Sequence, residues 1–160
     1  MKRIIFLCVI LISFGCNRVP ISGLVPAQGK VLFDGVPIGN VNIVFTPQPG
    51  STSDRIATAV TKNDGMFTLE TNSYAGVLPG QYNVTLSKTT TVSKISSEEE
   101  EKLSIAGKPI PEPDIVYHIP WKYGSTQTSG ISIKIDKKGK TDILIELKTD
   151  NTPLPIRSKI

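Results

Sequence analysis

The fold is decided by a stretch in which two strand-like runs flank a tight turn, IATAVTKNDGMFTLE at residues 56–70. Gly65 ends the turn and takes a positive φ without steric penalty, and Asn and Asp tolerate that conformation best among other residues. The flanking runs are rich in Thr, Val and Phe, which suit a pleated surface. Phe67 and Leu69 fall on one face and Thr68 on the other, which is the period of a half-buried strand. The stretch therefore predicts a β-hairpin.

The same alternation predicts five more strands. LPGQYNVTL at 78–86 opens with a Pro-Gly pair, and its Tyr, Val and Leu share one face. Residues 28–33 and 41–47 also alternate, with a turn between them. Residues 131–135 and 143–147 are predicted to pair as the clearest hairpin and to close one edge of a sandwich. With the two strands of the first hairpin, this gives seven strands.

Several short motifs, in this order, resemble those of transthyretin-like, carboxypeptidase-regulatory-like domains. More narrowly, they are similar to a large family of short bacterial lipoproteins that carry one such domain. The motifs are GKVLFDGVPI at 29–38, VNIVFTP at 41–47, TKNDGMF at 61–67, LPGQYNV at 78–84, IPWKY at 119–123 and TSGI at 128–131. The resemblance covers most of residues 27–148. It implies an all-β, about seven-stranded Greek-key β-sandwich of transthyretin-like (prealbumin-like) fold with a small, partly helical insertion. It implies no activity, because the family is largely without assigned chemistry.

The N-terminus reads as a signal peptide over residues 1–15. Lys2 and Arg3 precede an apolar run that is shorter than the ~20 residues a membrane span needs. The sequence SFGC at 13–16 resembles a lipobox, which predicts that Cys16 is lipidated and becomes the mature N-terminus. Two or three acyl chains would then hold the protein on a membrane of the cell envelope, facing the periplasm or the exterior. The alternatives are a plain anchor helix or a cleaved signal that leaves Cys16 as a free thiol.

The rest of the chain divides into a tether, one domain and a tail. Residues 16–26 contain Pro and Gly and are predicted to be the lipidated N-terminus and its tether. The sandwich domain covers 27–148, with an insertion at about 89–127 in which a serine at 96–97 caps a short, charged helix. Residues 149–160 are predicted to be a flexible tail.

Composition favours a single globular β domain without a nucleic-acid partner. The 160 residues include 39% hydrophobic and 20% charged residues, which are ordinary values. The net charge of +4 falls to +2 without Lys2 and Arg3, because 18 − 2 = 16 basic residues then face 14 acidic ones. So small a charge argues against nucleic-acid binding.

Few residues carry recognisable chemistry, and we predict neither a cofactor nor a metal site. One histidine, His118, cannot build a His-based metal site or a Ser-His-Asp arrangement by itself. Asp34, Asp54 and Asp64 lie in predicted turns and leave calcium binding as an alternative.

A group of aromatic residues surrounds the histidine. Trp121, Tyr123 and Tyr117, together with His118, are possible ligand-facing residues, because aromatic side chains are enriched at interfaces. Packing inside the Pro-rich loop is the alternative.

The sequence therefore predicts a non-enzymatic, extracytoplasmic, membrane-anchored lipoprotein. Its role would be structural or adhesive, or that of a binding module for an envelope protein or a glycan. The alternative is an accessory protein of an envelope enzyme or transporter, and a hydrolase is the least favoured reading. Exposed edges of such a sandwich could also pair edge to edge with another chain.

Overall fold

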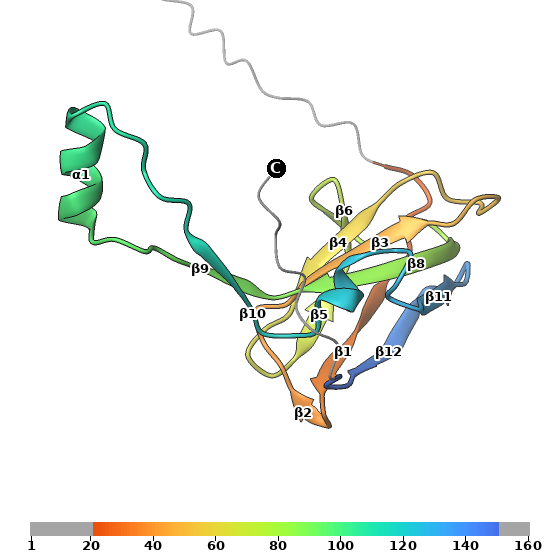
Figure 1. The fold of residues 1–160 in the computed structure, drawn as a ribbon. Coiled ribbons are helices and arrows are strands. Elements are labelled where there is room, and N and C mark those ends of the chain that lie inside the picture. Colours follow the sequence, from red (N-terminus) through yellow and green to blue (C-terminus); the bar gives the residue numbers. More distant parts are fainter. Residues whose placement is uncertain (1–20, 151–160) are drawn as a thin grey trace, which may run out of the picture.

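A computed structural model describes residues 21–150. The predicted signal peptide, Cys16 and the tail beyond residue 150 lie outside the described residues. Figure 1 shows a body of packed strands from which a long arm projects, with a helix at the tip of the arm. The mostly-β architecture predicted from the sequence is confirmed, and each of the seven predicted strands is present.

The larger sheet has six strands in the order β11-β8-β3-β4-β6-β7. All of its neighbouring strands are antiparallel. The strands are β3 (Asn42–Pro47), β4 (Ala57–Val60), β6 (Glu70–Thr71), β7 (Tyr74–Ala75), β8 (Gly80–Ser87) and β11 (Ile131–Ile135).

The smaller sheet is built around β1 (Ala27–Phe33). Along one side, β1 pairs in parallel with β12 (Lys140–Leu147), the last strand of the body. Along the other side, it pairs antiparallel with β5 (Met66–Thr68) and β2 (Val36–Pro37). The first and last strands of the body are therefore neighbours, and their pairing closes the smaller sheet.

One hydrophobic core receives side chains from both sheets. The residues of 78–86 predicted to share one face, Tyr82, Val84 and Leu86, are buried, as are the alternating residues Val41, Ile43 and Phe45 along β3. The rings of Phe45 and Tyr82 meet with centroids 5.9 Å apart. The Tyr82 hydroxyl donates to the Leu78 carbonyl oxygen at 2.7 Å, and burial raises the pKa of this hydroxyl.

The predicted hairpin over residues 56–70 forms at its turn and then divides. The Lys62 N–H donates to the Met66 carbonyl oxygen at 2.8 Å. Beyond the turn, β4 stays in the larger sheet, whereas β5 pairs with β1 in the smaller one. The two halves of the stretch pair again at Thr58 of β4 and Glu70 of β6. The prediction of a simple hairpin is therefore only partly right. β5 pairs with β1 instead of β4, because the backbone groups along that side of β1 need hydrogen-bonding partners.

The prediction that residues 131–135 and 143–147 pair with each other is wrong. β11 pairs with β8 in the larger sheet, and β12 pairs with β1 in the smaller sheet. Gly139 takes φ +86° between them, and the Lys140 N–H donates to the Pro26 carbonyl oxygen at 2.9 Å. At this contact the chain passes from the larger sheet to the smaller one. The isoleucines of both strands then pack into the one core from opposite sheets.

The first part of the predicted insertion forms the arm. Its elements are β9 (Thr89–Val92), α1 (Ser97–Ile105) and β10 (Asp114–Tyr117). β9 and β10 pair as an antiparallel ribbon, and α1 lies at the tip (Figure 1). The predicted cap is confirmed, since the Ser96 hydroxyl accepts a hydrogen bond from the Glu99 N–H at 3.2 Å.

We expect Gly29→Ala to weaken the pairing of β1 with β12. A Cβ at this position would lie 2.1 Å from the Ile143 carbonyl oxygen, so the two backbones must separate. The free energy of unfolding, measured by urea denaturation, should fall by about 1–3 kcal/mol or more. Gly124→Ala is the control, because its Cβ would lie 4.0 Å from the nearest atom, the Leu86 carbonyl oxygen. Equal stability of the two variants would contradict the described pairing.

Tyr82→Phe should lower the free energy of unfolding by about 1–3 kcal/mol, because the Leu78 carbonyl oxygen loses its donor inside the body. Tyr117→Phe serves as the matched control, since the Tyr117 ring is exposed on the arm. Chemical denaturation of both variants measures the difference. A Tyr82→Phe protein as stable as Tyr117→Phe would show that this partly buried hydrogen bond contributes nothing to stability.

Candidate functional site

The arm, defined here as residues 89–117, joins the body at one pair of residues. The His118 N–H donates to the Lys88 carbonyl oxygen at 2.9 Å. Lys88 follows directly on β8, so β9 continues the course of β8 beyond the sheet, as Figure 1 shows. The body is therefore closed at the base of the arm by a single hydrogen-bonded pair.

No residue of the arm is buried, and only Ile95 and Leu103 are partly covered. Six of the eleven large hydrophobic residues that are exposed within residues 21–150 nevertheless lie here. They are Val92, Ile105, Ile110, Ile115, Val116 and Tyr117. A two-stranded ribbon is marginally stable in water, and grouped apolar residues on a surface mark interaction sites. The arm is therefore the strongest candidate for a functional surface among the described residues.

The ribbon is apolar on both of its faces. Paired residues of an antiparallel ribbon point to the same side, and successive residues point to opposite sides. The pairing therefore sets Val92 and Val116 on one face, and Ile115 and Tyr117 on the other. A strand pair with one solvated face would alternate polar and apolar residues. β10 instead carries three consecutive apolar residues, so that apolar side chains occur on both faces of the ribbon beside the threonines of β9.

The arm leaves the body at the end opposite to the N-terminal segment. The Pro26 carbonyl oxygen accepts from the N–H of Lys140, where β12 begins. The preceding strand, β11, ends at Ile135, which pairs with Gly80 at the start of β8. β8 then runs for eight residues, about 25 Å at ~3.3 Å per residue, before the arm begins. The described N-terminal segment and the arm therefore lie at opposite ends of β8.

The arm is acidic, most of all at its tip. Its sequence holds six carboxylates and three lysines, a net charge of 3 − 6 = −3. Four of the carboxylates are consecutive, at 98–101 in α1. Lys102 pairs with Glu98 at 2.8 Å, one turn earlier in the helix. The other three glutamates are exposed at the tip, where they disfavour approach of another acidic surface.

Tyr117 and His118, two of the predicted ligand-facing residues, lie at the base of the arm. Both are exposed, and His118 Nε2 lies 3.0 Å from the Thr90 hydroxyl. Tyr117 ends β10 and His118 follows it, so the structure places both at the base of the candidate surface described above. That they contact a ligand stays a prediction.

The other two, Trp121 and Tyr123, belong to the 3₁₀ helix η1 (Trp121–Gly124) in the body. The Tyr123 ring is only 7% exposed, and its hydroxyl accepts from the Lys148 N–H at 3.0 Å. Lys122 pairs with Asp150 at 2.6 Å, so η1 holds the start of the predicted tail. The structure thus separates the four predicted residues into a pair on the arm and a pair in the body.

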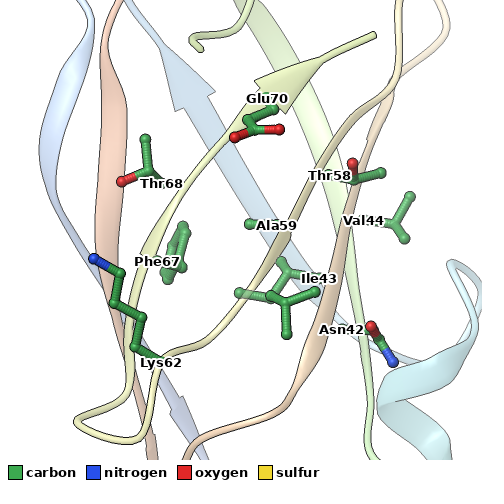
Figure 2. Close-up of a pocket in the computed structure, with 10 residues that line it drawn as sticks. Asn42, Ile43, Val44, Thr58, Ala59, Lys62, Phe67, Thr68 and Glu70 are labelled. Carbon is green, nitrogen blue, oxygen red and sulfur yellow. The ribbon is translucent and has the colours of Figure 1, made fainter. Parts of the chain in front are cut away.

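A cleft of about 540 Å³ opens where the hairpin strands β4 and β5 diverge. Figure 2 shows Phe67 and Thr68 on β5 across from Ala59 on β4. Its titratable lining residues are Lys62 and Glu70, and both are exposed. This arrangement offers two opposite charges at the rim of the cleft.

The three aspartates considered for calcium are not gathered at one site. Asp34 and Asp64 lie in turns near the end of β1, whereas Asp54 lies in the loop beside the start of β8. Among residues 21–150, no group of three or more His, Cys, Asp or Glu residues is placed to hold a metal ion. The Asp34 carboxylate instead accepts hydrogen bonds from the Thr149 N–H and hydroxyl, which hold its pKa below the ordinary value.

Comparisons with protein-family models, with curated proteins and with solved structures gave no match. In the part of the chain that the structure describes, no helix has the length and apolar composition needed to cross a membrane.

The sequence predicted the insertion and its short helix, and singled out Tyr117 and His118, but the apolar ribbon of the arm was not predicted. The signal was available in the run Ile115-Val116-Tyr117, three consecutive apolar residues inside a polar, Pro-rich insertion. Such a run breaks the period of two that a strand with one solvated face requires. Its partner strand, 89–92, is rich in Thr and gives a weaker signal.

Replacing residues 89–117 by Asn-Gly should leave the body folded. Lys88 and His118 are already a hydrogen-bonded pair, which a two-residue turn can close. Because the arm buries nothing, we expect the midpoint of thermal unfolding to change by no more than about 4 °C. Calorimetry of the variant beside the wild type measures this, and a body that no longer folds would contradict the separation of arm and body.

Proposed function

We propose that the chain is a non-enzymatic, extracytoplasmic lipoprotein that is anchored through Cys16 and presents its arm to a protein partner in the cell envelope. In this proposal the body is a transthyretin-like Greek-key sandwich that serves as a spacer and a support. The observation that carries the proposal is the arm, which has an acidic helix, a ribbon with apolar residues on both faces and no buried residue.

The position of the arm supports an anchored role. The described N-terminal segment and the arm lie at opposite ends of β8. A lipid on Cys16 would therefore hold the first end near the membrane and point the arm away from it. An arm with three free glutamates at its tip also suits this orientation, since anionic headgroups repel carboxylates.

The chemistry of the arm favours protein over glycan as the partner. Four of its six exposed apolar residues are aliphatic residues of the ribbon or helix, and both ribbon edges offer free backbone groups for strand pairing. A sugar-binding surface would need aromatic faces next to polar side chains, and the arm offers one aromatic ring, Tyr117.

Intact mass and fractionation test the anchor. Wild-type protein from membranes should have lost residues 1–15 and gained acyl chains, whereas Cys16→Ser should appear without acyl chains in the soluble fraction. The arm-replaced protein is the matched control, because it keeps Cys16 and should remain in the membrane. Unmodified wild-type protein in the soluble fraction would contradict the lipoprotein assignment.

Chemical crosslinking in membranes tests the role of the arm. We expect crosslinked protein complexes with the wild type and their loss with the arm-replaced protein. Loss of another envelope protein's activity, without loss of crosslinks, would favour the accessory-protein alternative. Hydrolase activity in a protein that forms no complex would overturn the proposal.

A further inference from the structure

We propose that the arm pairs with the arm of a second copy of this chain through the outer edge of β10, so that two ribbons form one four-stranded antiparallel sheet. This inference rests on the proposed function, because it names the partner of the same arm. It follows from the backbone geometry of β10 and from the order of its side chains.

The outer edge of β10 presents the backbone groups of two residues. His118 and Lys88 form a hydrogen-bonded pair, and such pairs alternate along an antiparallel ladder. Val116 and Asp114 therefore bond inward to β9, and the N–H and C=O groups of Ile115 and Tyr117 point outward. No strand within residues 21–150 pairs with this edge.

The edge is complementary to itself. When two β10 strands pair antiparallel about a two-fold axis at Val116, Ile115 of one copy stands opposite Tyr117 of the other. These are the two residues whose backbone groups point outward, so each of the two pairs exchanges two hydrogen bonds, four in all. Pro113 lacks an N–H group, so the row of outward backbone donors on this edge ends just before β10.

The side chains match in the same register. Each Tyr117 ring lies beside the Ile115 side chain of the second copy, an aromatic and β-branched pair that stabilises antiparallel sheets. On the opposite face, the two Val116 side chains meet at the axis. Pairing thus brings apolar side chains of the two copies into contact across the new edge on both faces of the ribbon.

The positions of the charged residues also favour a second copy of the chain as the partner. This register brings Asp114 opposite His118 of the second copy, so that a carboxylate meets an imidazole N–H donor at both ends of the pairing. Asp114 also pairs with Lys94 of its own chain at 2.9 Å on that face. The antiparallel arrangement sends the two acidic α1 tips to opposite ends of the new sheet, where they do not repel each other.

The outer edge of β9 is the weaker candidate. Its outward backbone groups belong to Thr89 and Thr91, the cross-ribbon neighbours of Tyr117 and Ile115. Threonine offers less apolar contact than the Ile and Tyr of β10. The two edges therefore make different predictions, and β9 supplies a matched control for each test.

Cysteine crosslinking at the axis tests the register. In full-length protein in membranes, Val116→Cys should form a disulfide-linked dimer under mild oxidation, because the position faces itself. Thr90→Cys lies on the same face one strand further out, where two copies are too far apart. We expect about tenfold more dimer from Val116→Cys than from Thr90→Cys. The wild type, whose only cysteines are Cys8 and Cys16, gives the background from unprocessed chains.

Proline at the outward positions tests which edge pairs. Ile115→Pro removes an outward N–H and should abolish the Val116→Cys dimer while leaving the bonds to β9 in place. Thr91→Pro makes the same change on the opposite edge and should leave the dimer intact. Circular dichroism and the amount of membrane-bound protein confirm that both variants fold.

Each outcome decides the proposal. No excess of Val116→Cys dimer over Thr90→Cys, or equal loss with both prolines, would overturn pairing through β10. A disulfide to a different protein would overturn the second copy as partner but keep the proposed function. A soluble, unacylated wild type that still gave the Val116→Cys dimer would instead contradict the anchor and support the pairing.

Discussion

The parallel pairing of β1 with β12 is the contact on which the rest of the structure depends. It joins the first and last strands of the body and needs Gly29, because a side chain there would meet the Ile143 backbone. With the body closed in this way, residues 89–117 contribute no buried residue to the core. They can therefore project as an arm from one hydrogen-bonded pair, Lys88 and His118.

The strands could be predicted from the sequence, but several of their partners could not. Alternation places Val84 and Leu86 in the core, because burial follows a period of two within one strand. Partner choice depends on contacts between distant residues. Gly139 against Pro26 sends β12 to the other sheet, and β5 leaves β4 to pair with β1. Turn chemistry predicted the turns correctly and said nothing of these exchanges.

The candidate site could be predicted in part for the same reason. Tyr117 and His118 stand out by residue type alone, and the structure places them where the arm meets the body. Tyr123 stands out equally but is packed in the core, which its type cannot reveal. The proposed function of the arm depends on the apolar side chains that it leaves exposed. That property belongs to the whole fold, and only the apolar run at 115–117 hints at it in the sequence.

The central claim is that the arms of two copies pair through β10, and amide hydrogen exchange tests it most directly. Exchange is measured on the full chain in two states, dilute in detergent and densely reconstituted in vesicles. The claim predicts that the outward amides of Ile115 and Tyr117 exchange fast when dilute and become protected when dense. The amides of Thr89 and Thr91 should stay fast in both states, since they face the other edge. Unchanged exchange at Ile115 and Tyr117, or equal protection of the β9 amides, would contradict it.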